Sequence, residues 1–234
     1  MKILALETSA VTASVAVAEE EKLLAQSFQN SGLTHSATLM PMAADLLRNT
    51  GLTLDEMDVI AVAAGPGSFT GIRIGVAAAK GLAWKGDKPC APCSTLASMA
   101  WNMAHMDGEI CAVMDARRDQ VYNARFRAEG GVLTRLTPDR AIGLAELMAE
   151  LRAAGSRPVL VGDGAALCAR TFAENGLDYV MAPPHLVYQT ACGVAREALE
   201  LVRTGGLVSA GALTPQYHRL SQAERERLER EKKL

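Results

Sequence analysis

The order of predicted strands and helices repeats along the chain, and this repeat constrains the fold more than any other feature. Hydrophobic periodicity in the first half predicts strands at 2–9, 13–18 and 22–29, a helix at 35–50, a strand at 59–64, a helix at 70–84, a strand at 88–92 and a helix at 94–104. The second half gives strands at 110–115, 120–127 and 131–136, a helix at 143–154, a strand at 158–162, a helix at 164–174, a strand at 178–182 and a helix at 189–203. Each half is therefore predicted as βββαβαβα, and the strand from residue 110 follows the one from residue 2 by 108 residues.

This repeated order predicts the fold class. A three-strand meander followed by two right-handed crossovers gives a mixed sheet with helices on its faces, which is the ribonuclease-H-like lobe. Two such lobes in tandem form the architecture of actin, the sugar kinases and the heat-shock chaperone ATPases. We therefore predict an α/β protein with one lobe at 1–107, a second at 108–205, and an extended segment with a charged tail at 206–234. A single irregular α/β domain is the alternative.

Composition narrows the class of partner. Apolar residues make up 49% of the 234 residues and charged residues 21%, which is typical of a globular protein with a sizeable core. The 24 Lys and Arg are outnumbered by 26 Asp and Glu, so the net charge of −2 argues against a protein that grips nucleic acid alone. Contact with RNA would need a partner. We find no signal-peptide core and no run of about 18 apolar residues, and expect a cytoplasmic protein with no membrane partner.

Catalytic and metal-binding patterns are absent from the sequence. The five cysteines are an odd number in apolar surroundings, which favours reduced core thiols, and the Cys90–Cys93 pair has no second pair to complete a zinc site. The four histidines include no pair at i,i+4, and no serine or cysteine lies in a nucleophile-elbow sequence. We therefore predict no catalytic residue, no metal ligand and no cofactor.

Two hairpins lie where kinases and ATPases of this architecture bind phosphate. The first contains Glu7-Thr8-Ser9 and lacks the glycine that lets backbone amides wrap a phosphate, which argues against nucleotide hydrolysis. The second contains Asp115-Ala116-Arg117-Arg118-Asp119. Two arginines beside two aspartates are typical of a self-neutralising surface network, and anion binding is the alternative.

A glycine loop, Gly65-Pro66-Gly67-Ser68-Phe69-Thr70-Gly71-Ile72-Arg73, follows a predicted strand and opens a helix, where free amides and the helix dipole attract anions. It is neither a dinucleotide fingerprint, because the third glycine comes one place late, nor a P-loop, because Lys-Ser/Thr is missing. Equally compatible is a structural role, in which the glycines permit a sharp turn and Ser68 or Thr70 caps the helix.

The helices at 35–50 and 70–84 are candidates for a partner surface. The first spreads its apolar residues over an arc of about 200°, wider than one core contact needs, and the second carries small residues that let another backbone approach. A helix wrapped by its own lobe is the alternative. The predicted interface residues are Leu39, Met40, Met42, Ala43, Leu46, Gly71, Ile72, Gly75 and Ala79.

Three stretches together resemble the bacterial TsaB (YeaZ-like) family: Ile3–Ser9, Gly65–Gly75 and Met114–Tyr122. This family takes part in making threonylcarbamoyladenosine next to the tRNA anticodon. The family-motif residues are Glu7, Thr8, Ser9, Gly65, Pro66, Gly67, Ser68, Phe69, Thr70, Arg73, Asp115, Arg117 and Arg118. The chain departs from the family pattern at Glu7, where Asp is commoner, and at His218.

The resemblance implies a non-catalytic scaffold subunit. It implies a heterodimer with the catalytic paralogue TsaD, an ATPase (TsaE) that joins the pair, tRNA reached only through the complex, and a homodimer in the absence of the paralogue. The paralogue carries a metal-binding His-x-x-x-His. At that position this chain has His35, with Leu39 in place of the second histidine four residues later. The competing hypothesis is a sugar-kinase-like ATPase or phosphotransferase that uses the cleft between the lobes.

Overall fold

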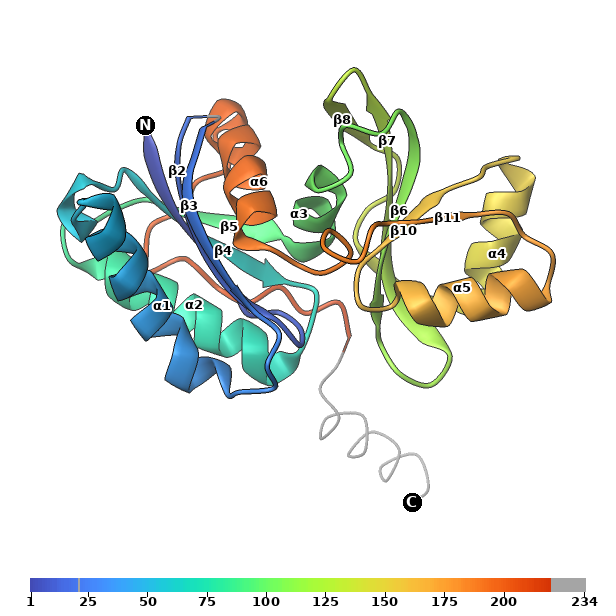
Figure 1. The fold of residues 1–234 in the computed structure, drawn as a ribbon, viewed down its shortest axis with the longest axis horizontal. Helices are drawn as coiled ribbons and strands as arrows, with labels where there is room; N and C mark the ends of the chain where they lie inside the picture. The colour runs from blue at the N-terminus through green and yellow to red at the C-terminus, as the bar shows by residue number, and fades with distance from the viewer. Residues whose placement is uncertain (21, 220–234) are drawn as a thin grey trace.

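The computed structural model describes residues 1–20 and 22–219, which form two lobes, each built on its own sheet (Figure 1). The first sheet contains β1 (Lys2–Glu7), β2 (Ala13–Glu19), β3 (Lys22–Gln29), β4 (Val59–Gly65) and β5 (Cys90–Ser94). Its order is β3-β2-β1-β4-β5, in which the three-strand meander is antiparallel and β4 and β5 are parallel to β1. The predicted tail is outside the described residues from residue 220 onward.

The second sheet repeats this order. It contains β6 (Gly108–Asp115), β7 (Gln120–Glu129), β8 (Val132–Arg135), β9 (Arg140–Gly143), β10 (Val159–Val161) and β11 (Val180–Met181). The order β11-β10-β6-β7-β8 is the first sheet's order read from the other edge, and β9 is an additional short strand beside β7. The tandem duplicated α/β fold predicted from the repeat is confirmed.

The helices begin and end where local chemistry directs. They are α1 (His35–Thr50), α2 (Phe69–Trp84), α3 (Thr95–Trp101), α4 (Leu144–Ala153), α5 (Ala165–Glu174) and α6 (Ala191–Thr204), with a 3₁₀ turn at Leu54–Glu56. The Ser68 and Ser94 hydroxyls cap α2 and α3 by accepting the amide three residues ahead. Gly51 and Gly205, both left-handed, close α1 and α6.

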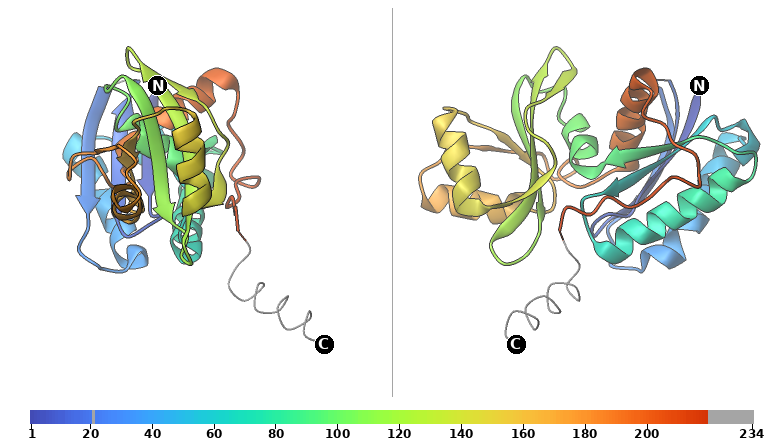
Figure 2. Two further views of the ribbon diagram at one scale, coloured as in Figure 1. Left: turned by 90° about the vertical axis from the view of Figure 1, so that its right-hand side faces the viewer. Right: turned by 180° about the vertical axis from the view of Figure 1, so that it is seen from behind.

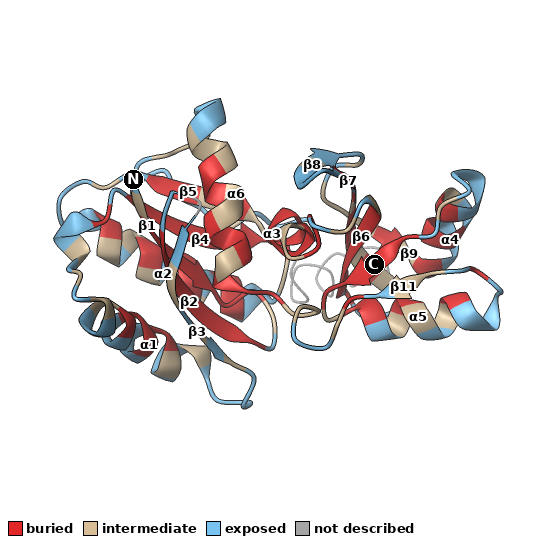
Figure 3. Ribbon diagram, turned by 45° about the horizontal axis from the view of Figure 1, so that its top comes forward, coloured by how far each residue is buried: buried red, intermediate tan, exposed pale blue. Residues whose placement is uncertain are grey.

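Each sheet has one outer face covered by helices of its own lobe. Helices α1 and α2 bury the first sheet around Leu4, Leu6 and Val62, and α4 and α5 bury the second around Val113 and Leu160. Figure 3 shows the central strands of both sheets as buried, whereas the edge strands β3 and β8 and the far sides of these helices carry exposed residues. No helix in the described part of the chain has the length and hydropathy of a membrane span.

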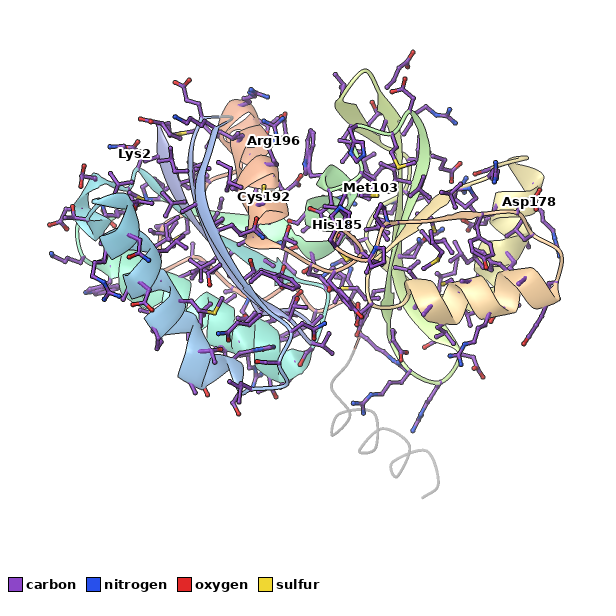
Figure 4. The ribbon with its side chains drawn as sticks, viewed as in Figure 1. Lys2, Met103, Asp178, His185, Cys192 and Arg196 are labelled. Carbon is purple, nitrogen blue, oxygen red and sulfur yellow. The ribbon has the colours of Figure 1, made fainter. Side chains whose placement is uncertain are left out.

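The inner faces are covered by helices that come from the opposite half of the chain. Helix α6 packs on the first sheet, against Ile3, Ala5 and Ala61, whereas α3 packs on the second sheet, against Ile110 and Phe126. In Figure 4, Cys192 and Arg196 mark α6 beside the first sheet, and Met103 marks the end of the α3 segment on the side of the second. The lobe boundary predicted at residue 107 lies between the strands of the first sheet and those of the second. Helices α3 and α6, in contrast, each pack on the sheet formed by the other side of that boundary.

Helices α3 and α6, which we call exchanged because each covers the sheet of the opposite half, contact each other between the two sheets. A Cβ atom on Gly193 would lie 2.1 Å from the Ser98 carbonyl oxygen, so α6 can approach α3 this closely only with glycine at that position. The Thr190 hydroxyl donates to Asn102 Oδ1 at 3.0 Å. The Arg196 guanidinium lies 5.0 Å from the centre of the Trp101 ring, and the Trp101 indole donates to Glu197 at 2.9 Å.

After α6, residues 206–219 return across the first lobe to the junction of the lobes, as the view from behind shows (Figure 2, right); we call them the C-terminal strap. Val208 pairs with Cys90 as an isolated β-bridge. Lys80 Nζ on α2 donates to the Gly211 and Leu213 carbonyls, and the buried Leu213 joins the core beneath α2. The strap therefore belongs to the packed structure of the first lobe.

Candidate functional site in the cleft between the lobes

Four segments line a cleft of about 620 Å³ between the two lobes: the β1–β2 turn, the N-terminus of α2, the β6–β7 hairpin and the end of the strap. All three family-motif stretches predicted from the sequence contribute lining residues, including Ser9, Phe69 and Arg117. The structure therefore brings together three motifs, of which the first and the last are separated by more than one hundred residues in the chain.

The β1–β2 turn is buried where it leaves β1, whereas Val11 at its tip is 55% exposed. Glu7, Thr8 and Ser9 are all inaccessible to solvent, and the Ser9 amide donates to Glu7 Oε1. Glu7 Oε2 and the Ser9 hydroxyl have no hydrogen-bond partner among the described residues. Burial raises the pKa of the Glu7 carboxyl to about 7, against the opposing effect of the hydrogen bonds from Ser9.

A second carboxyl faces Glu7 from the other lobe. Asp163, in the loop between β10 and α5, accepts a hydrogen bond from Gln189 Nε2 at 2.7 Å, and the Gln189 carbonyl accepts one from Thr12. Burial also raises the pKa of Asp163, and its charge contributes to the raised pKa of Glu7. The sequence analysis missed Asp163 and Gln189, since neither belongs to a recognisable motif.

The glycine loop presses α2 against the β1–β2 turn. A Cβ atom on Gly71 would lie 2.1 Å from the Thr8 carbonyl oxygen, and one on Gly67 would lie 2.4 Å from the Ser9 carbonyl oxygen. The Thr8 hydroxyl donates to the Gly71 carbonyl at 2.8 Å. Together with the Ser68 cap, this geometry gives the loop the structural role: close approach and a helix start.

The β6–β7 hairpin is exposed and has an unusual backbone. Arg117, Arg118 and Asp119 have φ angles of 62°, 57° and 56°, so three consecutive non-glycine residues are left-handed. The Asp115 carboxylate accepts the Arg117 amide at 2.6 Å, and Leu144 donates its amide to the Asp119 carbonyl at 3.1 Å. No carboxylate in residues 1–20 and 22–219 forms an ion pair with the Arg117 guanidinium.

The strap closes one side of the cleft and connects the lobes. Gln216 donates its amide to the Ala64 carbonyl at 2.7 Å, and Arg219 donates to the Ala116 carbonyl of the opposite lobe. Tyr217 stacks on Phe69 with ring centres 4.9 Å apart, and Arg73 Nε donates to the Tyr217 hydroxyl at 2.7 Å. Tyr217 is a further cleft residue that the sequence analysis did not single out.

Most of the predicted interface residues lie in the core of their own lobe. Those with side chains buried in the core of the first lobe are Leu39, Met42, Ala43, Leu46, Ile72 and Ala79. Gly71 and Gly75 face Thr8, and a Cβ atom on Gly75 would lie 2.5 Å from its hydroxyl. Met40, with 43% of its surface exposed, is the member of the set that a partner could reach directly. Its contact with a partner stays a prediction.

His35 is the first residue of α1. Its Nε2 donates to the Ala10 carbonyl at 2.7 Å, which fixes the ring against the β1–β2 turn. The opposite ring nitrogen, Nδ1, is buried without a partner in the described part of the chain.

Known proteins resemble the chain over most of its length. The family model TsaD, described as tRNA N6-adenosine threonylcarbamoyltransferase, matches residues 22–215. The tRNA threonylcarbamoyladenosine biosynthesis protein TsaB of Bacillus subtilis (strain 168) is 39% identical over 160 residues, which are 68% of this chain and 69% of the relative. The protein of the same name from Escherichia coli (strain K12) is 36% identical over 56% of this chain and 58% of its own length.

Solved structures agree with these relatives. A Pseudomonas aeruginosa protein described as uncharacterised, with similarity to peptidase YeaZ, is 27% identical and superposes with a TM-score of 0.80 over 93% of this chain and 99% of its own. YeaZ from the same organism is 26% identical and superposes with a TM-score of 0.78 over 92% of this chain and 99% of its own. The ethanolamine utilization protein EutJ from Carboxydothermus hydrogenoformans, 12% identical with a TM-score of 0.52, shares the fold alone.

The two-lobed fold and the matched family model define the class: the chain belongs to the TsaD family. Its relatives and the YeaZ structures identify it as a TsaB (YeaZ-like) member of that family, which confirms the resemblance seen in the sequence.

Proposed function

We propose that the chain acts in the biosynthesis of threonylcarbamoyladenosine in tRNA as a non-catalytic subunit. In this role it binds a TsaD-like catalytic paralogue, a TsaE-like ATPase joins the pair, and the complex works on tRNA in the cytoplasm. Two relatives named as tRNA threonylcarbamoyladenosine biosynthesis protein TsaB support the pathway. The TsaD-like paralogue and the TsaE-like ATPase are the partners that the resemblance to the TsaB family implies.

The state of the β1–β2 turn carries the non-catalytic part of the proposal. A phosphotransferase of this architecture needs an accessible acid and free backbone amides at this turn. Here Glu7 is fully buried and takes the Ser9 amide for itself, while the Ser9 carbonyl accepts the Ser68 amide at 2.7 Å. The Ser9 amide is therefore not free for a phosphate, and the Glu7 carboxyl is not accessible to a bound metal.

The outward side of α1 and α2 is the surface that we assign to the paralogue. The two helices pack beside each other on the first sheet. Their exposed residues include a small or apolar set, Ala37, Met40, Pro41 and Ala44 on α1 and Ala77, Gly81 and Trp84 on α2, alongside polar and charged ones such as Asp45, Arg48 and Arg73. Trp84 is 78% exposed, an unusual state for so large an apolar side chain. Exposed apolar side chains at the centre of a polar surface are typical of protein interfaces.

Reconstitution tests the proposal. We expect the TsaD-like paralogue and the TsaE-like ATPase to modify tRNA with this chain present and to lose that activity without it. Met40→Glu together with Ala77→Glu should weaken binding to the paralogue by tenfold or more, roughly 1.4 kcal/mol, with unchanged thermal unfolding. Glu174→Lys on α5, which is exposed in the second lobe, serves as the control.

Two results would overturn the proposal. One is full modification in the absence of the chain. The other is ATP turnover by the purified chain that is abolished in Glu7→Gln, because it would make the cleft a catalytic site and favour the competing ATPase or phosphotransferase.

A further inference from the structure

Basic side chains gather at the mouth of the cleft from both lobes and from the strap. We call this group the basic rim: Arg73 on α2, Arg117 and Arg118 on the β6–β7 hairpin, and His218 and Arg219 on the strap. All except Arg73 and Arg118 also line the cleft itself. The rim combines elements that are far apart in the sequence, so its composition is a property of the folded chain.

The backbone of the hairpin holds two of these arginines outward. A left-handed conformation is costly for a non-glycine residue, and three such residues follow one another at Arg117, Arg118 and Asp119. The tip is closed by the bonds from Ala116 N to Gln120 O at 3.0 Å and from Gln120 N to Arg117 O at 3.3 Å. A hairpin that only connected two strands would use glycine or asparagine here, whereas strain of this kind clusters at binding sites.

Aromatic rings accompany the charges. The Arg73 guanidinium lies 3.7 Å from the centre of the Phe69 ring, and Tyr217 stacks on Phe69. Phe69 and Tyr217 are 38% and 44% exposed. Arginine beside partly exposed aromatic rings is typical of surfaces that bind single-stranded and looped RNA, because bases stack on such rings while phosphates meet the guanidinium groups. Since Tyr217 and Arg73 already pack on the Phe69 ring, Tyr217 is the ring left for a base.

The rim places basic side chains together on a chain whose net charge is negative. Its described residues hold four arginines beside the exposed Asp115 and Asp119; Asp115 Oδ1 accepts the Arg117 amide, Arg219 donates to the Ala116 carbonyl and Arg73 donates to the Tyr217 hydroxyl. The chain as a whole carries −2. A cluster of arginines on an acidic protein suits a phosphodiester contact made within a larger assembly, since a guanidinium has five N–H donors and can bind a phosphate oxygen while it keeps another partner.

We propose that the basic rim contacts the phosphodiester backbone of RNA directly, so that this subunit touches the tRNA instead of reaching it only through its paralogue. The RNA is taken as tRNA on the strength of the proposed function. An acidic protein surface is the competing partner, and the experiment below separates the two.

The test compares two double variants that remove equal charge. Arg117→Gln with Arg118→Gln removes the hairpin charges, and Arg157→Gln with Arg170→Gln removes two exposed charges elsewhere on the second lobe. In the reconstituted complex, we expect the hairpin variant to bind tRNA about 5- to 20-fold more weakly at 0.1 M salt. The slope of log affinity against log salt should become shallower by roughly 1 for each phosphate that the variant no longer binds. Arg117→Lys with Arg118→Lys should retain most of the affinity.

Affinity for the paralogue, measured without RNA, is the second readout. Weaker tRNA binding with unchanged paralogue binding supports the proposal. Unchanged tRNA affinity overturns it, and so does loss of paralogue binding in the Gln variant, which would make the hairpin a protein-docking surface.

Failure of the proposed function is recognised separately, because the wild-type chain would then neither bind the paralogue nor support modification. In that case fluorescence anisotropy of the full chain with a labelled anticodon stem-loop at 20 mM salt decides. Weaker binding by the hairpin variant than by the Arg157 and Arg170 control supports the proposal, and equal binding overturns it.

Discussion

The two hairpins at equivalent positions of the two lobes have opposite environments. The β1–β2 turn buries Glu7, Thr8 and Ser9 completely, whereas the β6–β7 hairpin exposes Arg117 and Arg118. Both lie beside a glycine-containing loop that approaches them closely. The difference lies in where each loop makes contact.

In the first lobe, Gly67 and Gly71 approach the carbonyls of Ser9 and Thr8, beyond the end of β1, so the start of the turn, up to Ser9, is covered. In the second lobe, a Cβ atom on Gly162 would lie 2.0 Å from the Val113 carbonyl, and one on Gly164 would lie 2.8 Å from the Met114 carbonyl carbon. These contacts fall inside β6. The hairpin tip therefore extends past the covering loop. The same strand topology buries the Glu7 carboxyl in the first lobe and exposes the Arg117 and Arg118 side chains in the second.

The largest expected effect concerns the covering of the first turn. Gly71→Ala places a methyl group against the Thr8 backbone and should lower the free energy of unfolding by about 3 kcal/mol, measured by denaturant titration. Gly81→Ala, in the same helix with no atom within 4 Å of the new Cβ, should raise it by about 0.5–1 kcal/mol. Equal effects of the two changes would show that α2 does not press on the turn.

Next in size is the pH dependence of Glu7. Its folded pKa of about 7 lies above the ordinary value of 4.5, so the native state holds a proton that the unfolded state releases between these values. Stability from this group therefore falls as pH rises through that window, by about 3 kcal/mol in total. Glu7→Gln cannot ionise, and its free energy of unfolding relative to wild type should increase between pH 4.5 and 8.

Glu56 provides the matched control for Glu7. The hydrogen bond from the Thr53 amide lowers the pKa of this exposed carboxyl, so its stabilising effect is present above its ordinary pKa and is lost as pH falls. Glu56→Gln should therefore alter the stability profile only in the acid range. A Glu7→Gln profile parallel to wild type from pH 4.5 to 8 would mean that the first turn is open to water.

The smallest effect concerns the second hairpin. Arg118→Gly relieves one left-handed residue and should raise the free energy of unfolding by about 0.5–1 kcal/mol, since part of the relief is offset by the greater freedom of glycine in the unfolded chain. Arg157→Gly, which has no left-handed backbone to relieve, should not stabilise. Destabilisation by Arg118→Gly would contradict a strained tip and leave the exposure of the two hairpins as their only contrast.

Much of the fold can be predicted from the sequence because each element carries its own periodicity. The helix at 35–50 agrees with the structure at both ends, and the repeated order of elements matches the sheet order of both lobes. β9 escapes prediction because its sequence, Arg-Ala-Ile-Gly at Arg140–Gly143, has a single strong strand former and no alternation of apolar and polar residues. Periodicity also shows that a helix is apolar without showing which sheet it covers, so it cannot indicate the exchange of α3 and α6.

The site is harder to predict. The motif stretches contribute Ser9, residues of the glycine loop and Arg117 to one cleft, but the buried state of Glu7 and the role of Tyr217 depend on contacts between distant segments. The wide apolar arc of α1 favours a partner surface when only the sequence is considered. In the structure Leu39 and Met42 fill the lobe's own core, and a helix packed between a sheet and a neighbouring helix shows the same arc.

The exchange of α3 and α6 bears on how the chain is made. The inner face of the first sheet, with Ile3 and Ala5, is covered by residues 191–204, so a nascent chain emerging from the ribosome must carry that apolar face uncovered until nearly the whole sequence has been translated. The second sheet has no such delay, because α3 precedes it and is ready when β6 appears. The lobe that is synthesised first is thus completed last. A product truncated before residue 191 leaves the ribosome with the apolar inner face of its first sheet exposed and prone to aggregation.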